Sequence, residues 1–157
     1  QPIAGYNYGA KKYDRVKQVY GLTVRCALLI STLAFVLFQL FPRQIISVFG
    51  DGSEEYFLFA VRYIRIFLFA TFLNGIQPVT STFFTAIGKP VKGIFLSMTR
   101  QILFLLPLIV VFPLFLGIDG IMYAGPIADL AAGAAAIGMI AAEMRQITEL
   151  ERVENAF

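Results

Sequence analysis

Four long apolar runs dominate the chain, and each is long enough to cross a membrane as a helix. They cover about residues 21–41, 66–86, 91–115 and 121–143. The hydrocarbon core of a bilayer is about 30 Å thick, and roughly 20 helical residues cross it. The pattern therefore predicts an all-α, polytopic membrane bundle of four transmembrane helices. The end of a preceding helix comes before them, and a short cytoplasmic tail follows.

The breaks between the runs divide the chain into three parts. We expect the end of a preceding helix and a basic cytoplasmic elbow at 1–19, the four-helix transmembrane part at 20–145 and the cytoplasmic tail at 146–157. Pro42 ends the first run, and residues 44–49 are expected to form a short surface turn. Ser53 is a good N-cap, so the second helix starts there and is longer than the membrane is thick. Gly88 and Pro90 mark a tight hairpin between the second and third helices.

Basic residues gather on one side of the predicted membrane. The connections on that side carry Lys11, Lys12, Arg15, Lys17, Lys89, Lys92, Arg145 and Arg152, whereas the opposite side has Arg43 with Asp51, Glu54, Glu55 and Asp119. Lysine and arginine are enriched in the cytoplasmic connections of membrane proteins. We therefore expect a multi-pass protein of the plasma membrane with both termini of this segment in the cytoplasm.

Composition narrows the classes of function. Of the 157 residues, 58% are hydrophobic and 15% are charged, which is more apolar surface than a soluble core of this length could bury. The net charge of +3 comes without a basic stripe and interleaved aromatic residues, so we expect no nucleic-acid partner. Histidine is absent and Cys26 is the only cysteine, which excludes an internal disulfide and a histidine-based triad. We expect no metal site, no cofactor and no enzymatic activity.

Polar residues in the second helix fall on one face. The stripe consists of Thr71, Asn74, Ser81 and Thr85, with Gln77 adjoining and Pro78 between them. The proline removes one helical hydrogen bond, so we expect a kink near mid-depth that frees backbone carbonyls beside Asn74 and Gln77. Two interpretations stay open: the stripe joins the helix to its neighbours, or Asn74, Gln77 and Ser81 line a substrate or cation pathway.

Two ionisable residues lie deep in the third and fourth helices. Arg100, with Gln101 beside it, is about ten residues from the hairpin, and Asp129 is about ten residues from the connection on the other side. The two helices are antiparallel, so the residues reach similar depths; if both side chains point into the bundle, an ion pair between them lowers the cost of either charge in the membrane. Arg100, Gln101 and Asp129 are therefore candidate pathway residues. The pair is either a static latch or a carboxylate that takes up a proton or cation and releases the arginine.

Four separated stretches resemble one family of transporters. The stretches QPIAGYNYGAKKYDR, AIGKPVK, SMTRQILFLLP and FLGIDGIMYAGPIAD occur in that order, and together they resemble the second half of the multidrug and toxic compound extrusion (MATE) transporters. The resemblance implies twelve helices in two six-helix lobes. It also implies export of cationic or amphipathic compounds in exchange for sodium ions or protons.

The resemblance places individual residues. Gln1 lies at the end of the eighth helix, and the four runs are the ninth to twelfth. The family's helix-end signature corresponds to Gln1, Pro2, Gly5, Asn7 and Gly9, its inner turn to Gly88, its eleventh helix to Arg100, and its twelfth helix to Pro126 and Asp129. Some members carry an acidic residue in the tenth helix, where this chain has only Asn74 and Gln77. The coupling ion is then expected to bind at Asp129 or in the missing half of the protein.

These observations lead to one expected function and two alternatives. We expect part of a secondary active multidrug or organic-cation efflux antiporter, with the lipid bilayer, the missing N-terminal lobe and small amphipathic or cationic substrates as its partners. The absence of a Gly-x-x-x-x-Gly-Lys-Ser/Thr motif agrees with transport driven by an ion gradient. The alternatives are a flippase for lipid-linked oligosaccharides, which has a similar architecture, and a membrane assembly subunit that transports nothing.

Overall fold

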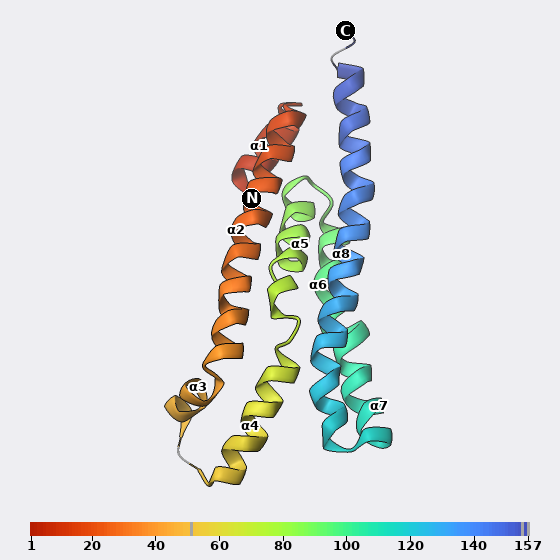
Figure 1. The fold of residues 1–157 in the computed structure, drawn as a ribbon. Helices are drawn as coiled ribbons and strands as arrows, with labels where there is room; N and C mark the ends of the chain where they lie inside the picture. Colours follow the sequence, from red (N-terminus) through yellow and green to blue (C-terminus); the bar gives the residue numbers. More distant parts are fainter. Residues whose placement is uncertain (51, 155, 157) are drawn as a thin grey trace.

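The chain is mainly helical in the part that the computed structural model describes, residues 1–50, 52–154 and 156. Asp51, counted above among the acidic residues of one connection, lies outside this part, as do the tail residues 155 and 157. The α-helices are α1 (Pro2–Gly9), α2 (Tyr13–Leu40), α3 (Pro42–Phe49), α4 (Glu54–Phe67), α5 (Ile76–Ala86), α6 (Pro90–Met98), α7 (Leu106–Leu116) and α8 (Ile118–Glu154). A 3₁₀ turn, η1 (Thr71–Leu73), and a π-helical turn, η2 (Thr99–Leu105), lie between them (Figure 1).

Four segments are long and apolar enough to cross a membrane, as predicted. They are Tyr13–Leu40, Glu54–Ala86, Pro90–Leu116 and Ile118–Glu154. The N-terminus and the end of α8 lie toward the end of the bundle where α5 turns into α6, which we call the turn end (Figure 1). We call the opposite end, with α3 and the α7–α8 connection, the far end. The predicted fold class of an all-α membrane bundle is confirmed.

The first crossing helix is longer than predicted. α2 begins at Tyr13, eight residues before the predicted start at Gly21, and its 28 residues extend about 42 Å at 1.5 Å per residue. Arg15 and Lys17, expected in a surface elbow, are therefore already helical, and the elbow between α1 and α2 is reduced to residues 10–12, which include Lys11 and Lys12. At the other end of α2, the predicted turn at 44–49 is the short helix α3, which begins with Pro42 at a position where a proline needs no N–H.

The second crossing segment is broken rather than kinked. The predicted N-cap is present, since the Ser53 hydroxyl accepts a hydrogen bond from the Tyr56 N–H at 3.3 Å. Regular α-helix ends at Phe67 and resumes at Ile76. Pro78 then lies in the first turn of α5, where backbone N–H groups have no intrahelical acceptor and its missing N–H costs nothing. The interruption therefore comes before Pro78.

The third and fourth segments also depart from the expected simple helices. Residues 99–105 form a π-turn between α6 and α7, just before Pro107, whose ring would otherwise crowd the carbonyl four residues earlier. α8 continues for 37 residues, about 55 Å, through the residues predicted as a separate tail, and it contains Pro126. Its length carries its C-terminal third beyond the hydrocarbon core.

The buried side chains form two clusters. The larger lies toward the turn end and contains Ala4, Val16, Ile76, Phe83, Phe84, Ile87, Leu96, Ala136, Ile140 and Ile147. The smaller joins η2 and α7 to α8 through Leu105, Ala124 and Ala128. Small residues of α8 allow this contact, because Gly120 lies directly against the backbone carbonyl of Phe112. Many large apolar side chains elsewhere are exposed, as expected for surfaces facing lipid or further protein.

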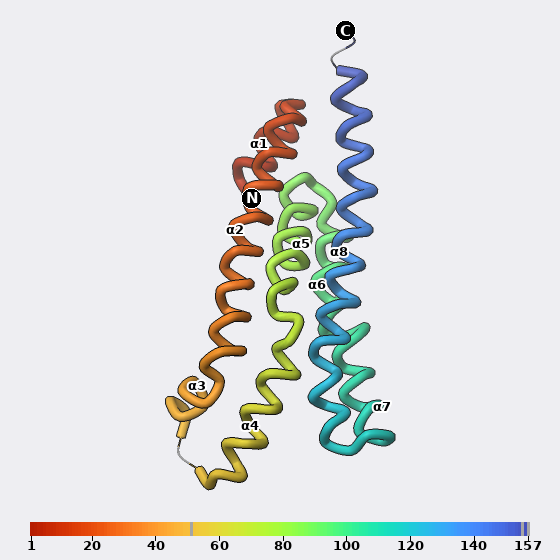
Figure 2. Tube along the Cα trace, viewed as in Figure 1, coloured from red at the N-terminus to blue at the C-terminus, as the bar shows by residue number. Residues whose placement is uncertain are grey.

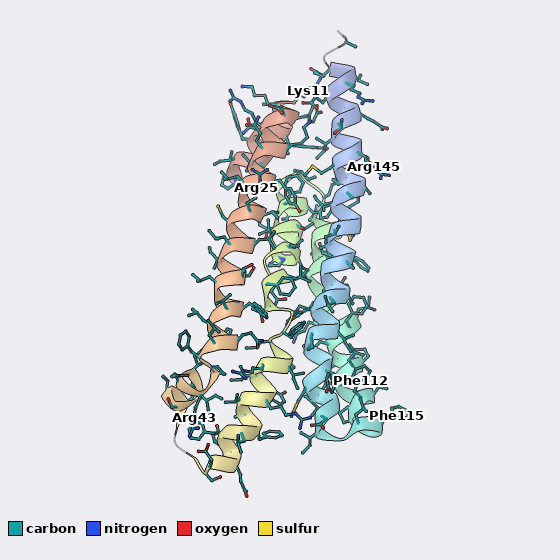
Figure 3. The ribbon with its side chains drawn as sticks, viewed as in Figure 1. Lys11, Arg25, Arg43, Phe112, Phe115 and Arg145 are labelled. Carbon is teal, nitrogen blue, oxygen red and sulfur yellow. The ribbon has the colours of Figure 1, made fainter. Side chains whose placement is uncertain are left out.

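Ion pairs concentrate at the turn end. Glu143 of α8 is fully buried and bonds both Lys89, the N-cap of α6, and Lys92 in the first turn of α6. Two further pairs along α8 are Lys17–Glu151 and Lys11–Glu154. The hydrogen bond to Glu154 and its negative charge raise the pKa of Lys11 above its usual value. Figure 3 shows Lys11 and Arg145 toward this end and Arg43 near the other, where it bonds Glu54.

Gly93 sets how closely α5 and α6 approach. A Cβ at this position would lie 2.6 Å from the Ser81 carbonyl oxygen and 2.7 Å from the Thr85 hydroxyl oxygen. We expect Gly93→Ala to destabilise the purified protein by about 1–3 kcal/mol, because the helices must separate. Unfolding in detergent measures the change.

Gly138→Ala is the matched control, since nothing lies within 4 Å of the added Cβ. Both substitutions gain helix propensity, so only crowding distinguishes them. Equal stability of the two variants would show that Gly93 does not set the approach of α5 to α6.

Candidate functional site

Arg100 and Asp129 meet inside the bundle. The Arg100 Nε donates a hydrogen bond to the Asp129 Oδ1 at 2.5 Å. The side chain of Asp129 is 2% exposed, and that of Arg100 is 29% exposed. The ion pair expected from their similar depths is therefore present. Each charge offsets much of the cost of placing the other in an apolar environment.

The helices around the pair explain why it forms. Arg100 lies in the π-turn η2, where the wider turn redirects side chains relative to an α-helix. On α8, Asp129 is flanked on its own face by two glycines. A Cβ on Gly125 would lie 2.8 Å from atoms of Phe67, and one on Gly133 would lie 3.9 Å from Leu73. Close approach of α4 and η1 therefore leaves Asp129 enclosed.

Two polar residues of the second segment bond the neighbouring helix. The Gln77 Nε2 donates to the Leu96 carbonyl at 2.6 Å, and the Ser81 hydroxyl donates to the Gly93 carbonyl at 2.7 Å. Both bonds join α5 to α6, which is what the helix-joining interpretation of the stripe expects. Asn74 is half-buried at the break, and no hydrogen bond of its side chain is found within the described residues. Gln101 is exposed next to the half-buried Arg100.

Several polar contacts near the break were not foreseen from the sequence. The Ser31 hydroxyl of α2 donates to the Phe72 carbonyl at 2.8 Å, so it satisfies one carbonyl freed by the break. The Thr80 and Tyr20 hydroxyls are 2.9 Å apart. Thr71 has a buried hydroxyl oxygen with no hydrogen-bond partner among the described residues. The sequence signal for these contacts is weak, because single hydroxyls are common in membrane helices.

Glu143 is a contact for which a sequence signal did exist. It follows an alanine- and isoleucine-rich stretch of α8, and two lysines flank the hairpin on the same predicted side of the membrane. A buried carboxylate requires a partner, and those lysines are the nearby candidates. The sequence interpretation ended the fourth helix at this residue, on the side of those lysines, but did not pair them.

The residues of the family's helix-end signature lie in and just before α1, and one of them lines a cavity. Pro2 is in the first turn of α1, and the buried Asn7 Nδ2 donates to the Ile3 carbonyl at 2.8 Å. A Cβ on Gly5 would lie 2.8 Å from the Ala86 carbonyl oxygen, so this glycine allows α1 to contact α5, whereas Gly9 has open space around it. Gln1 lines a cavity of about 240 Å³ together with Tyr20, Thr23, Pro78, Thr82 and others.

No group of three or more His, Cys, Asp or Glu side chains that could hold a metal ion is found in the described part of the chain. Metal ions are coordinated by several such side chains. The pair of Arg100 and Asp129 offers one carboxylate with a cation already beside it.

Residues 1–111 match the sequence profile of the MatE family. The chain belongs to the MATE family of transporters. Among curated proteins, it is 27% identical over 136 residues to a FAD transporter of Shewanella oneidensis, a match that covers 85% of this chain and 29% of that protein. It is also 28% identical over 117 residues to the uncharacterized protein MG447 of Mycoplasma genitalium, covering 70% of this chain and 20% of that one.

Solved structures place the fold in the same family. The MATE multidrug transporter DinF-BH, solved as a complex with a bound compound, is 36% identical, with a TM-score of 0.83; the match covers 88% of this chain and 31% of that one. An inward-facing multidrug resistance MATE transporter of the MOP superfamily has a TM-score of 0.84 at 16% identity, over 94% of this chain and 34% of that one. The chain therefore spans about a third or less of the length of these MATE relatives.

The coupling between Arg100 and Asp129 can be measured in the MATE protein. We expect Arg100→Met to lower stability by about 3–5 kcal/mol, because it leaves a buried carboxylate without its partner. The double variant Arg100→Met/Asp129→Leu should be less destabilised than Arg100→Met alone. Unfolding of the four proteins of this cycle in detergent gives the coupling energy.

The exposed pair of Arg62 and Asp119, 3.6 Å apart, is the control and should show a coupling of about 0–1 kcal/mol. If the two cycles gave the same coupling, the Arg100–Asp129 pair would contribute no more than a surface contact.

Proposed function

We propose that this chain is part of an efflux transporter that exports small cationic or amphipathic compounds across the plasma membrane in exchange for sodium ions or protons. Membership of the MATE family supports export of this kind. So does the 36% identity to a MATE multidrug transporter of known structure. The basic residues of the turn end support a cytoplasmic location for that end and for both termini of the segment.

The observation that carries the proposal is the position of the Arg100–Asp129 pair. The pair lies inside segments that the membrane encloses, next to the break at residues 68–75 and within the π-turn. Ionisable residues and interrupted helices at this depth are features of transport pathways. If Asp129 took up a proton or cation, its attraction for Arg100 would fall. The packing of η2 against α8 would then change with occupancy.

The remainder of the transporter is required for the activity. The chain spans about a third or less of its relatives, so a complete path needs the further helices of an N-terminal lobe, which we propose as the partner of this segment. The coupling ion can bind there or at Asp129. No cofactor enters the proposal, since an ion gradient supplies the driving force.

A second substrate class is supported by one relative. The FAD transporter of Shewanella oneidensis aligns over 85% of this chain, so an anionic dinucleotide is the alternative cargo. Competition separates the two classes: excess of a planar organic cation should block efflux of a fluorescent cationic dye, whereas FAD should not. Blockage by FAD alone would favour the alternative, and blockage by lipid-linked oligosaccharide would indicate a flippase.

We expect Asp129→Asn in the intact transporter to reduce the initial rate of ion-driven efflux of a fluorescent cationic dye from proteoliposomes by about tenfold or more, equivalent to roughly 1.4 kcal/mol. The amide cannot take up a proton or hold Arg100 as a charge. Arg100→Ala should abolish efflux. Imposing a sodium or a proton gradient separately identifies the coupling ion.

Asp119→Asn is the matched control, because its carboxylate is half-exposed at the far end and should be replaceable. Normal transport by Asp129→Asn, in protein that reconstitutes fully, would confine Asp129 to a structural role and remove the proposed link to the coupling ion.

A further inference from the structure

Interruptions of the crossing helices lie at one level of the bundle. The segment from α4 to α5 is broken at residues 68–75, and the segment from α6 to α7 contains η2. Both contact one short stretch of α8, because Arg100 of η2 bonds Asp129 and Leu73 of η1 lies beside Gly133. Asp129 and Gly133 are about one helical turn apart.

α8 itself is weakened near this level. Pro126 lies within the helix, about one turn from Asp129, and it removes one backbone hydrogen bond. Two of the four crossing segments are thus interrupted at this depth, whereas α2 and α8 are continuous helices in the described chain, α8 with one backbone hydrogen bond fewer at Pro126. Figure 2 shows the tube leaving its helical path between α4 and α5 about midway along the bundle.

On the turn side of this level, polar contacts bind the elements into one unit. α8 is joined to the start of α6 by the pairs Lys89–Glu143 and Lys92–Glu143, to α2 by Lys17–Glu151 and to the α1–α2 connection by Lys11–Glu154. The bonds of Gln77 and Ser81 to the α6 backbone lie here too. The larger buried cluster fills the same region. These contacts must break together for the elements to separate, so this half is stiff.

On the far side, α4 is held by fewer polar contacts. Within the described residues, α4 is linked to α8 by the exposed ion pair Arg62–Asp119, with 3.6 Å between the charged atoms. Exposed pairs of this kind contribute little to stability. The Gln39 Nε2 of α2 donates to the Arg65 carbonyl at 2.9 Å. α7 packs on α8 through the small apolar cluster. The far half is therefore less strongly tied to its surroundings than the turn half.

We propose that this level is a hinge, about which α4 and α7 move relative to the rigid turn end. The Arg100–Asp129 ion pair fixes the angle between α7 and the turn end. A π-turn holds an extra residue compared with an α-helix. Moving that residue along the chain changes the direction of α7 without breaking the backbone. Arg100 lies in this turn, and its bond to α8 fixes the register. The hinge is a property of the fold and is independent of which compound the intact protein moves.

The size of the motion can be estimated. A change of about 20° is a sharp kink for a helix. α7 has 11 residues and extends about 16 Å. Such a kink therefore moves its far end by about 6 Å, which is well within the resolution of distances between two spin labels.

Pulsed electron–electron double resonance on the intact transporter in lipid nanodiscs tests the hinge. The exposed Cys26 is first replaced by serine so that it takes no label. One label pair, Leu40→Cys with Leu114→Cys, spans α2 and α7 on the far side, and the matched pair, Leu22→Cys with Val91→Cys, spans α2 and α6 on the turn side. All four positions are exposed.

We expect Asp129→Asn to shift or broaden the far-side distance by about 6 Å and to leave the turn-side distance unchanged. Glu143→Gln should do the opposite and broaden the turn-side distance. The hinge is refuted if Asp129→Asn changes neither distance, or changes both equally.

A measurement without these variants covers the case in which Asp129→Asn does not fold. In the otherwise unaltered protein, the far-side distance distribution should already be broader than the turn-side one, since only the former crosses the hinge. Equal widths would overturn the proposal. Normal dye efflux by Asp129→Asn together with a changed far-side distance would instead count against the proposed function alone and leave the hinge standing.

Discussion

A polar group inside hydrocarbon has no water to bond, and this constraint governs the arrangement of the bundle. Where the helices are regular, the backbone N–H and C=O groups form hydrogen bonds with each other. Where they are interrupted, side chains supply the bonds: Ser31 bonds the Phe72 carbonyl, and Gln77 bonds the Leu96 carbonyl. The two deepest charges, Arg100 and Asp129, satisfy one another. Each interruption is tolerated because another element lies close enough to bond it.

Close approach between helices is therefore the second requirement, and small residues provide it. Gly93 lets α5 and α6 touch through their backbones, while Gly120 and Gly125 let α8 touch α7 and α4. Without a hydrophobic driving force between helices in lipid, such packing and the bonds that it permits hold the bundle together. Gly125 also flanks Asp129, so the packing of α8 on α4 and the enclosure of the candidate site share this residue.

The distribution of contacts connects the fold to its family. The turn end is bound by several ion pairs to the long α8, and Glu143 is buried between two lysines. The far end is bound by apolar contact, by the exposed pairs Arg43–Glu54 and Arg62–Asp119 and by the hydrogen bond of Gln39 to the Arg65 carbonyl. A MATE transporter must expose its pathway to each side of the membrane in turn, which requires stiff parts that move against one another. A segment that is stiff at one end and interrupted at mid-depth suits that requirement.

Much of this protein follows from its sequence alone, because crossing a membrane imposes a length and a composition that are visible in any apolar run. The four segments, the hairpin at Gly88 and Pro90, the Ser53 N-cap and the meeting of Arg100 with Asp129 were all predicted in this way. What the tertiary structure decided is where regular helix fails. Pro78 indicated a kink, but the break lies earlier because a proline is tolerated in the first turn of a helix. The π-turn, the full length of α8 and the burial of Glu143 depend on partners distant in the chain. Those partners come together only when the helices pack, so no local pattern records them.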